Sequence, residues 1–172
     1  MIDTAISCVL DELNGYLATR FPGQDKMAVM ASLARPDGGR TVGLDDKLVL
    51  SLVNIEHEAQ LAATGFVARA GRANASVRLN LYVMVAASYA GNYGHALNML
   101  DQAMACFRER PRIDAQHSGS FPSSMLQLDI ELVSLSLSEL HTLWTIQGAS
   151  YLPSVVYKLR VVTQPEMPSS LP

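Results

Sequence analysis

The densest group of side chains that could carry chemistry is the run Glu56, His57 and Glu58. Carboxylates and imidazoles serve general acid–base catalysis and bind transition metals. The run follows an apolar stretch that predicts a β-strand, in which neighbouring side chains point to opposite faces. Only Glu56 and Glu58 can therefore share a face, and we interpret the run as the polar end of a strand. A small-molecule-binding or enzymatic site on these three residues is the alternative.

The remaining histidines and the small nucleophiles match no catalytic or metal-binding pattern. His95 and His141 lie on predicted helices without a histidine or carboxylate at metal-binding spacing. Ser118 and Gly119 do not form the G-x-S-x-G nucleophile turn, and no phosphate-binding glycine motif is present. The sequence therefore predicts a protein that is not an enzyme and that needs no cofactor and no metal.

Length and composition indicate one globular domain. The chain has 172 residues, of which 49% are hydrophobic and 17% charged, with a formal net charge of −3. A chain without basic excess does not neutralise phosphates, so no nucleic-acid partner is expected. The most apolar segment, residues 79–90, is shorter than the ~20 residues of a membrane span. Cys8 and Cys106 lie in separate apolar helical patterns, which predicts free thiols and a cytoplasmic site of synthesis and assembly.

The first half of the chain predicts one helix and then several strands. Apolar residues recur at helical spacing, then alternate along shorter runs that glycine and proline interrupt. The predicted elements are a helix around residues 6–17 with Asp3 as its N-cap, a strand within 27–33, a loop or hairpin turn at 34–44, a strand at 47–55 buried on both faces in the middle of a sheet, an exposed loop at 69–76 and an alternating strand at 77–85.

The second half predicts two helices that separate two further strands. Its predicted elements are a helix over 96–107 that Asn92 caps and whose buried stripe includes Leu97 and Met104, a loop at 112–124, a strand at 126–132, a helix that opens with a Ser136–Glu139 capping box and stops at Gly148, and a strand at 155–163. This order predicts an α+β fold, a two-layer domain over residues 1–163 with a mostly antiparallel or mixed sheet and about three helices. The proline-rich tail, residues 164–172, is predicted to be disordered.

Arginine dominates the basic residues and marks candidate interfaces. Ten of the thirteen basic side chains are arginine, which pairs with carboxylates across protein interfaces. The arginines at 108, 110 and 112 either interact with a helix dipole or form a patch for an acidic partner. Tyr82, on the polar face of its strand, either joins an aromatic interface or lies under a helix. The residues assigned to a protein interface are Arg69, Arg72, Arg78, Tyr82, Arg108, Arg110 and Arg112.

Three parts of the chain carry motifs of one family. They are MIDTA at 1–5 before an amphipathic helix, LNLY at 79–82 followed by the helical ALNML at 96–100, and, in the C-terminal third, LVSLS at 132–136, Leu143-Trp144, Gly148 and YLPSVVY at 151–157. Together these segments resemble the tail-terminator, or cap, family of contractile injection systems, the phage-tail-like particles of the antifeeding-prophage and virulence-cassette type.

The resemblance implies a fold similar to that of phage tail terminators and a structural role without catalysis or cofactor. Such proteins form a six-membered ring on the distal end of the tube and sheath, stop polymerisation and tie the sheath to the tube. The expected partners are therefore further copies of the chain in a homo-hexamer, together with sheath and inner-tube proteins. The expected location is the cytoplasm during assembly and then the particle, which can be released from the cell. A connector or baseplate-side adaptor of the same particle is the alternative.

Overall fold

The computed structural model describes residues 1–24, 26–58, 78–116 and 121–163. Its sheet has six strands in the order β1-β2-β3-β6-β5-β4. Strands β1 and β2 are parallel, and every other neighbouring pair is antiparallel. The elements are α1 (Ile2–Arg20), β1 (Ala28–Met30), β2 (Lys47–His57), β3 (Arg78–Ser88), α2 (Tyr93–Glu109), β4 (Arg112–Ile113), β5 (Met125–Val133), α3 (Leu137–Gln147) and β6 (Ser154–Thr163). The predicted α+β fold with a mixed sheet and three helices is confirmed.

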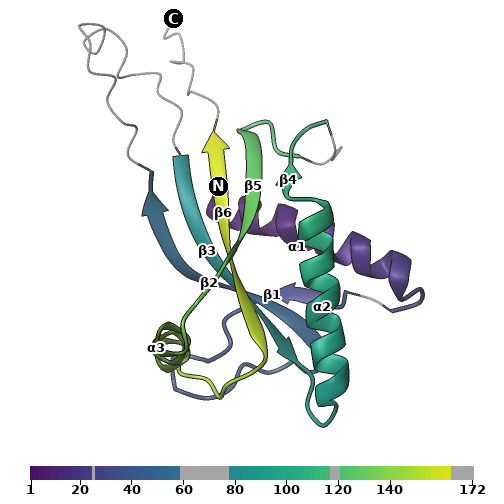
Figure 1. Ribbon diagram of the computed structural model, residues 1–172, viewed down its shortest axis with the longest axis vertical. Coiled ribbons are helices and arrows are strands. Elements are labelled where there is room, and N and C mark those ends of the chain that lie inside the picture. The colour runs from purple at the N-terminus through teal and green to yellow at the C-terminus, as the bar shows by residue number, and fades with distance from the viewer. Residues whose placement is uncertain (25, 59–77, 117–120, 164–172) are drawn as a thin grey trace, which may run out of the picture.

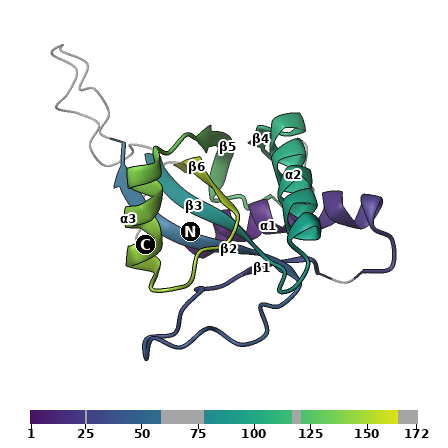
Figure 2. The ribbon, with the colours of Figure 1, turned by 60° about the horizontal axis from the view of Figure 1, so that its bottom comes forward.

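The helices lie on both faces of the sheet. Helices α1 and α2 cover one face, and α3 lies against the lower part of the other (Figures 1 and 2). The larger core fills the space under α1 and α2, where Leu48, Leu81 and Leu159 are fully buried. A smaller core under α3 contains Met84 and Trp144. The predicted two layers thus describe the α1–α2 face, and α3 adds a partial third layer.

Of the N-caps predicted for the first two helices, one is confirmed and one is wrong. Asn92 caps α2 as predicted, because its side-chain oxygen accepts the backbone N–H of His95 at 3.0 Å. The prediction for Asp3 was wrong. Helix α1 begins at Ile2 with Met1 as its N-cap, since the Met1 carbonyl accepts the N–H of Ala5. Asp3 lies in the first turn, where its carboxylate interacts favourably with the positive end of the helix dipole.

The buried stripe of α2 differs from the predicted one. Leu97 is 45% exposed and Met104 is half-buried, whereas Met99 and Cys106 are fully buried. The stripe that packs on the sheet is Ala96, Met99, Leu100, Ala103, Cys106 and Phe107. Because a helix with apolar residues on several sides offers two similar stripes, the sheet rather than the sequence decides which one is buried.

The burial of the long strands β2 and β3 differs from the prediction. Strand β2 is buried only over Leu48–Ser51 and becomes mostly exposed beyond them, because the neighbouring β1 pairs with just three of its residues. Strand β3 lies between β2 and β6, and its second half, Val83–Ser88, is buried on both faces. The strand buried in the middle of the sheet is therefore β3 and not β2.

Part of the predicted loop at 112–124 is a strand. Arg112 and Ile113 form β4 and pair with Asp129 and Leu128 of β5. The Ile113 side chain is buried, and this burial fixes the short strand at the edge of the sheet. The predicted loop at 69–76 and the predicted tail at 164–172 lie outside the described residues.

Helix α3 begins and ends as its sequence predicts. The Ser136 hydroxyl accepts the backbone N–H of Glu139, and the Glu139 carboxylate accepts the backbone N–H of Ser136 at 2.8 Å. These two hydrogen bonds are the predicted capping box. The Ser136 hydroxyl also donates to the Glu139 carboxylate, at 2.7 Å, and this bond together with the Ser136 backbone N–H lowers the pKa of Glu139. At the other end Gly148 adopts a left-handed conformation with φ of 63°. Because glycine has no β-carbon, residue 148 can adopt this conformation without a steric clash and end the helix.

We expect Gly148→Ala to lower the free energy of unfolding by about 1–2 kcal/mol, the cost of a left-handed conformation for a residue with a β-carbon. A β-carbon at position 148 would meet only the Ala34 side chain, at 3.9 Å, so backbone strain is the whole effect. Gly15→Ala in α1 is the matched control, since its β-carbon meets nothing within 4 Å, and it should raise stability slightly. Urea unfolding of both variants measures the difference. Equal effects of the two substitutions would contradict this account of the Gly148 turn.

Candidate protein-interaction surface

The Glu56–His57–Glu58 run lies at the end of β2 and is used for contacts between strands. The Tyr82 hydroxyl donates to Glu56 at 2.9 Å. Arg160 of β6 donates to both oxygens of Glu58, at 2.7 and 2.9 Å. His57 pairs in register with Leu79 and so points to the opposite face. Among the described residues, no three His, Cys, Asp or Glu side chains are placed to hold a metal ion.

Charged side chains continue across this face of the sheet above α3. Lys158 of β6 lies 3.0 Å from Glu131 of β5, and Arg112 of β4 lies 2.6 Å from Asp129. Hydrogen bonds to these carboxylates raise the pKa of Lys158 and that of Arg112. A polar cleft of about 180 Å³ runs between the side chains of Glu58, Asn80, Asp129, Glu131, Lys158 and Arg160. Lys158, Arg112 and Arg160 are therefore each paired with a carboxylate on this face.

The predicted arginine patch lies where α2 ends and β4 begins. Arg110 forms an ion pair with Glu12 of α1, which raises the pKa of Arg110, and Arg112 is paired with Asp129. Arg108 is exposed and makes no ion pair with any residue in the described part of the chain. Glu12 and residues 109–113 together line a groove of about 440 Å³. Two of the three arginines are thus paired within the described chain, and the interface role predicted for Arg108 stays a prediction.

The structure does not bring all the predicted interface residues onto one surface. Arg78 and Tyr82 lie four residues apart along β3 and therefore share one face of the sheet. The register places Arg112 on this face as well. Arg108 and Arg110 belong to the α2 side instead. Tyr82 is half-buried beside the core under α3. Of its two predicted positions, the one under a helix is therefore met in part. Arg69 and Arg72 lie outside the described residues.

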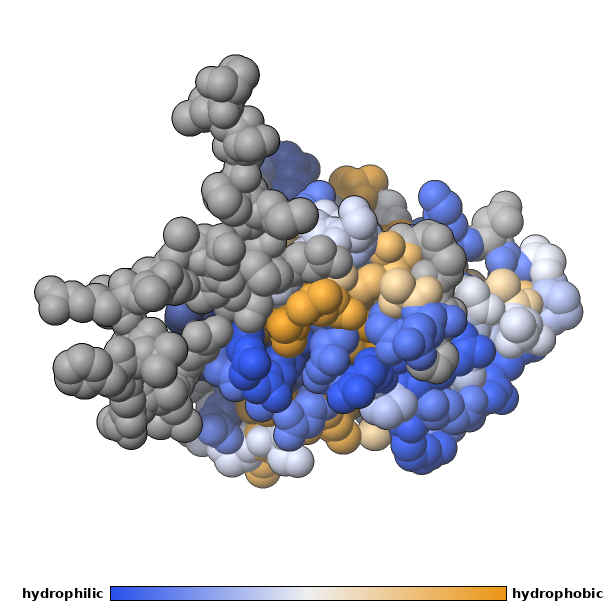
Figure 3. Space-filling view, turned by 90° about the horizontal axis from the view of Figure 1, so that it is seen from above, coloured by the Kyte–Doolittle hydropathy of each residue, from blue (hydrophilic) through white to orange (hydrophobic). Residues whose placement is uncertain are grey.

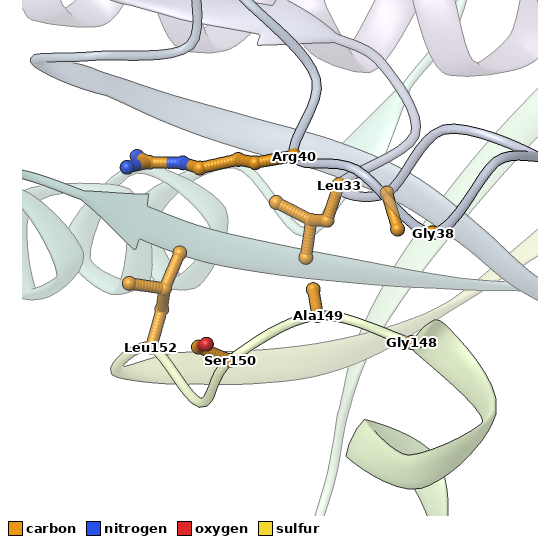
Figure 4. Close-up of a pocket in the computed structure, with 8 residues that line it drawn as sticks. Leu33, Gly38, Arg40, Gly148, Ala149, Ser150 and Leu152 are labelled. Atoms are coloured by element: carbon orange, nitrogen blue, oxygen red, sulfur yellow. The ribbon is translucent and has the colours of Figure 1, made fainter.

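A small cavity separates the 33–44 segment from the link between α3 and β6 (Figure 4). Its volume is about 210 Å³, below the range of typical ligand sites. Leu33, Ala149 and Leu152 make most of its wall apolar. Arg40, at its rim, donates to the Ser88 hydroxyl at 2.8 Å and pairs with Asp45 at 3.1 Å. The cavity therefore offers packing space rather than reaction chemistry.

Sequence reasoning missed the exposed outer half of β2. Leu52 and Ile55 were assigned to a buried strand, yet they are 38% and 44% exposed. The signal in the sequence is the change from the apolar run at 48–53, which only Ser51 interrupts, to the polar Asn54 and the acidic end of the strand. Such a change marks the point at which a strand leaves the covered part of a sheet.

The comparison with protein families gives a match over most of the chain. No helix formed by residues 1–24, 26–58, 78–116 and 121–163 has the length and apolar character to cross a membrane. The family model described as the Pvc16 N-terminal domain matches residues 5–169. No curated protein matches the chain.

Two solved structures share the fold. One is the sheath/tube terminator, in its extended state, of the extracellular contractile injection system PVC, with a TM-score of 0.52 and 17% identity. The other is the tube-terminating cap of the anti-feeding prophage AFP, with a TM-score of 0.53 and 16% identity. Each match covers 94% of this chain and 58% of the solved one, so the chain spans little more than half the length of these structures. The resemblance seen in the sequence is confirmed, and the chain belongs to the Pvc16 N-terminal domain family.

Proposed function

We propose that the chain is the terminator, or cap, of a contractile injection system. In this role it ends polymerisation of the inner tube and ties the sheath to the tube at the end of the particle that is distal to the baseplate. The observation that carries the proposal is the shared fold with two such terminators over 94% of the chain. The paired charges on the described faces support a structural rather than an enzymatic role.

The proposal includes the assembly of the chain. Six copies form a ring, and the ring contacts sheath and tube proteins. The chain is made and assembled in the cytoplasm and then forms part of the particle. The match to a terminator of an extracellular contractile injection system supports the final location of the chain in the particle.

Deletion of the gene tests the role, and electron microscopy of purified particles measures the result. We expect tubes of variable length and sheaths that detach from the tube, because nothing then ends either polymer. The chain supplied on a plasmid should restore uniform particles. Gold-labelled chain should appear at the end opposite the baseplate. Normal particles without the gene would refute the proposal, and label at the baseplate would indicate an adaptor instead.

A further inference from the structure

Helix α3 covers only part of its face of the sheet and closes a separate, small core. It lies against the lower part of that face (Figure 1), whereas at the upper end of the molecule hydrophilic residues surround apolar ones at the surface (Figure 3). The core under α3 shares no buried residue with the larger core under α1 and α2, because the sheet lies between them. The two sides of the sheet can therefore lose their packing independently of each other.

Few buried residues hold α3 in place. Of its eleven residues, Leu143 and Trp144 alone are buried, whereas α1 and α2 each bury six. Leu137 and Ile146 are 86% and 75% exposed, so these two apolar side chains do not attach the helix to the sheet. A helix with few buried apolar contacts belongs to the part of a structure that opens at a low free energy.

Polar contacts fix α1 to the sheet more firmly than α3. The Asn14 amide of α1 donates to the Ala28 carbonyl and accepts the Ala28 N–H, both at 3.0 Å. Within the described chain, the single side-chain hydrogen bond from α3 to another element is that of the Trp144 indole with Ser154, at 3.3 Å. Trp144 is therefore the one residue that both packs α3 on the sheet and hydrogen-bonds it there.

Both connections of α3 are short links that can act as hinges. Residues 134–136 join β5 to α3, and residues 148–153 join α3 to β6. The second link begins with the left-handed Gly148 and borders the cavity of about 210 Å³, so it is not closely packed on the 33–44 segment (Figure 4). Residues at the ends of elements absorb the backbone rotation when a helix or a domain moves.

We propose that α3 is a lid that leaves the sheet as one unit while the α1–α2 side stays folded. The two links are its hinges. Opening breaks the hydrogen bond of the Trp144 indole and uncovers Val49, Met84 and Val156 on three neighbouring strands. Lid opening of this kind takes microseconds to seconds. The inference goes beyond the proposed cap function and does not depend on it.

Residue-resolved hydrogen exchange of the purified chain tests the lid. In the wild type, the amides at 143–146 in α3 should exchange at least about 10-fold faster than those at 103–107 in α2. Val9→Ala removes two methyl groups from the core under α1 and should accelerate exchange at 103–107 by about 10–100-fold. Exchange at 143–146 should keep its wild-type rate, because the open lid leaves Val9 buried. Similar wild-type rates in the two helices, or equal acceleration of both by Val9→Ala, would overturn the proposal.

A thiol under the lid gives a second, independent measurement. Val156→Cys places a thiol in the core under α3, and Cys106, buried under α2, is the internal control on the other face. Both are labelled with a maleimide in a Cys8→Ser background, and each rate is divided by that of the same thiol in the urea-unfolded chain. We expect the normalised rate at position 156 to exceed that of Cys106 by at least about 10-fold. Equal rates would mean that the two cores open only together, and the lid would be refuted.

Discussion

Trp144→Ala is expected to lower the free energy of unfolding by about 3–5 kcal/mol, the range for removal of a large buried aromatic side chain. Trp144 is 6% exposed and packs in the core under α3 with Val49, Met84 and Val156. Its indole N–H donates to the Ser154 hydroxyl at 3.3 Å. The substitution would therefore leave a cavity between α3 and the sheet and remove the contact that fixes α3 to the start of β6.

This effect is large compared with the free energy of unfolding of a typical domain, which is ~5–15 kcal/mol. Guanidinium unfolding followed by circular dichroism measures it. Ile146→Ala on the same helix is the matched control, because Ile146 is exposed and its removal should change stability by less than about 0.5 kcal/mol. Similar unfolding midpoints for the two variants would show that α3 contributes little to the fold.

The elements that the sequence predicted best are those decided by neighbours in the chain. Asn92 and the Ser136–Glu139 pair cap their helices through atoms within three residues, and Gly148 ends α3 through its own φ. These interactions form in almost any tertiary surrounding. The α+β class followed as well, because each periodic run kept its predicted type.

What the sequence could not predict depends on contacts between distant segments. The exposure of Ile55 follows from the short length of β1, and the burial of Ile113 follows from its pairing with Leu128. The side chains that neutralise the predicted arginines are equally distant, since Glu12 pairs with Arg110 and Glu58 with Arg160. A run of arginines in sequence therefore suggested a larger free basic patch than the fold leaves.

Alkaline pH is expected to destabilise the fold strongly. Burial raises the pKa of Cys106 from its usual 9.0 to about 12. Burial likewise raises the pKa of Tyr89 and that of Tyr157 from 10.0 to about 12. Above pH 9 to 10 the unfolded chain loses protons that the folded chain keeps, so the unfolded state binds fewer protons. The free energy of unfolding then falls by about 1.4 kcal/mol per pH unit for each group until pH 12.

Tyr157→Phe isolates one of these groups. The Tyr157 ring packs edge-on against Phe107 at 4.9 Å, and phenylalanine keeps that contact. At pH 7, where the phenol is protonated in both states, the variant should be about as stable as the wild type. At pH 11 it should be more stable by about 1.4 kcal/mol, because its unfolded state gains nothing from ionisation at this position. Tyr93→Phe, which removes an exposed hydroxyl, should follow the wild type at both pH values. Urea unfolding at pH 7 and pH 11 measures the three proteins, and a parallel loss of stability in all of them would mean that the Tyr157 phenol ionises as freely in the core as in water.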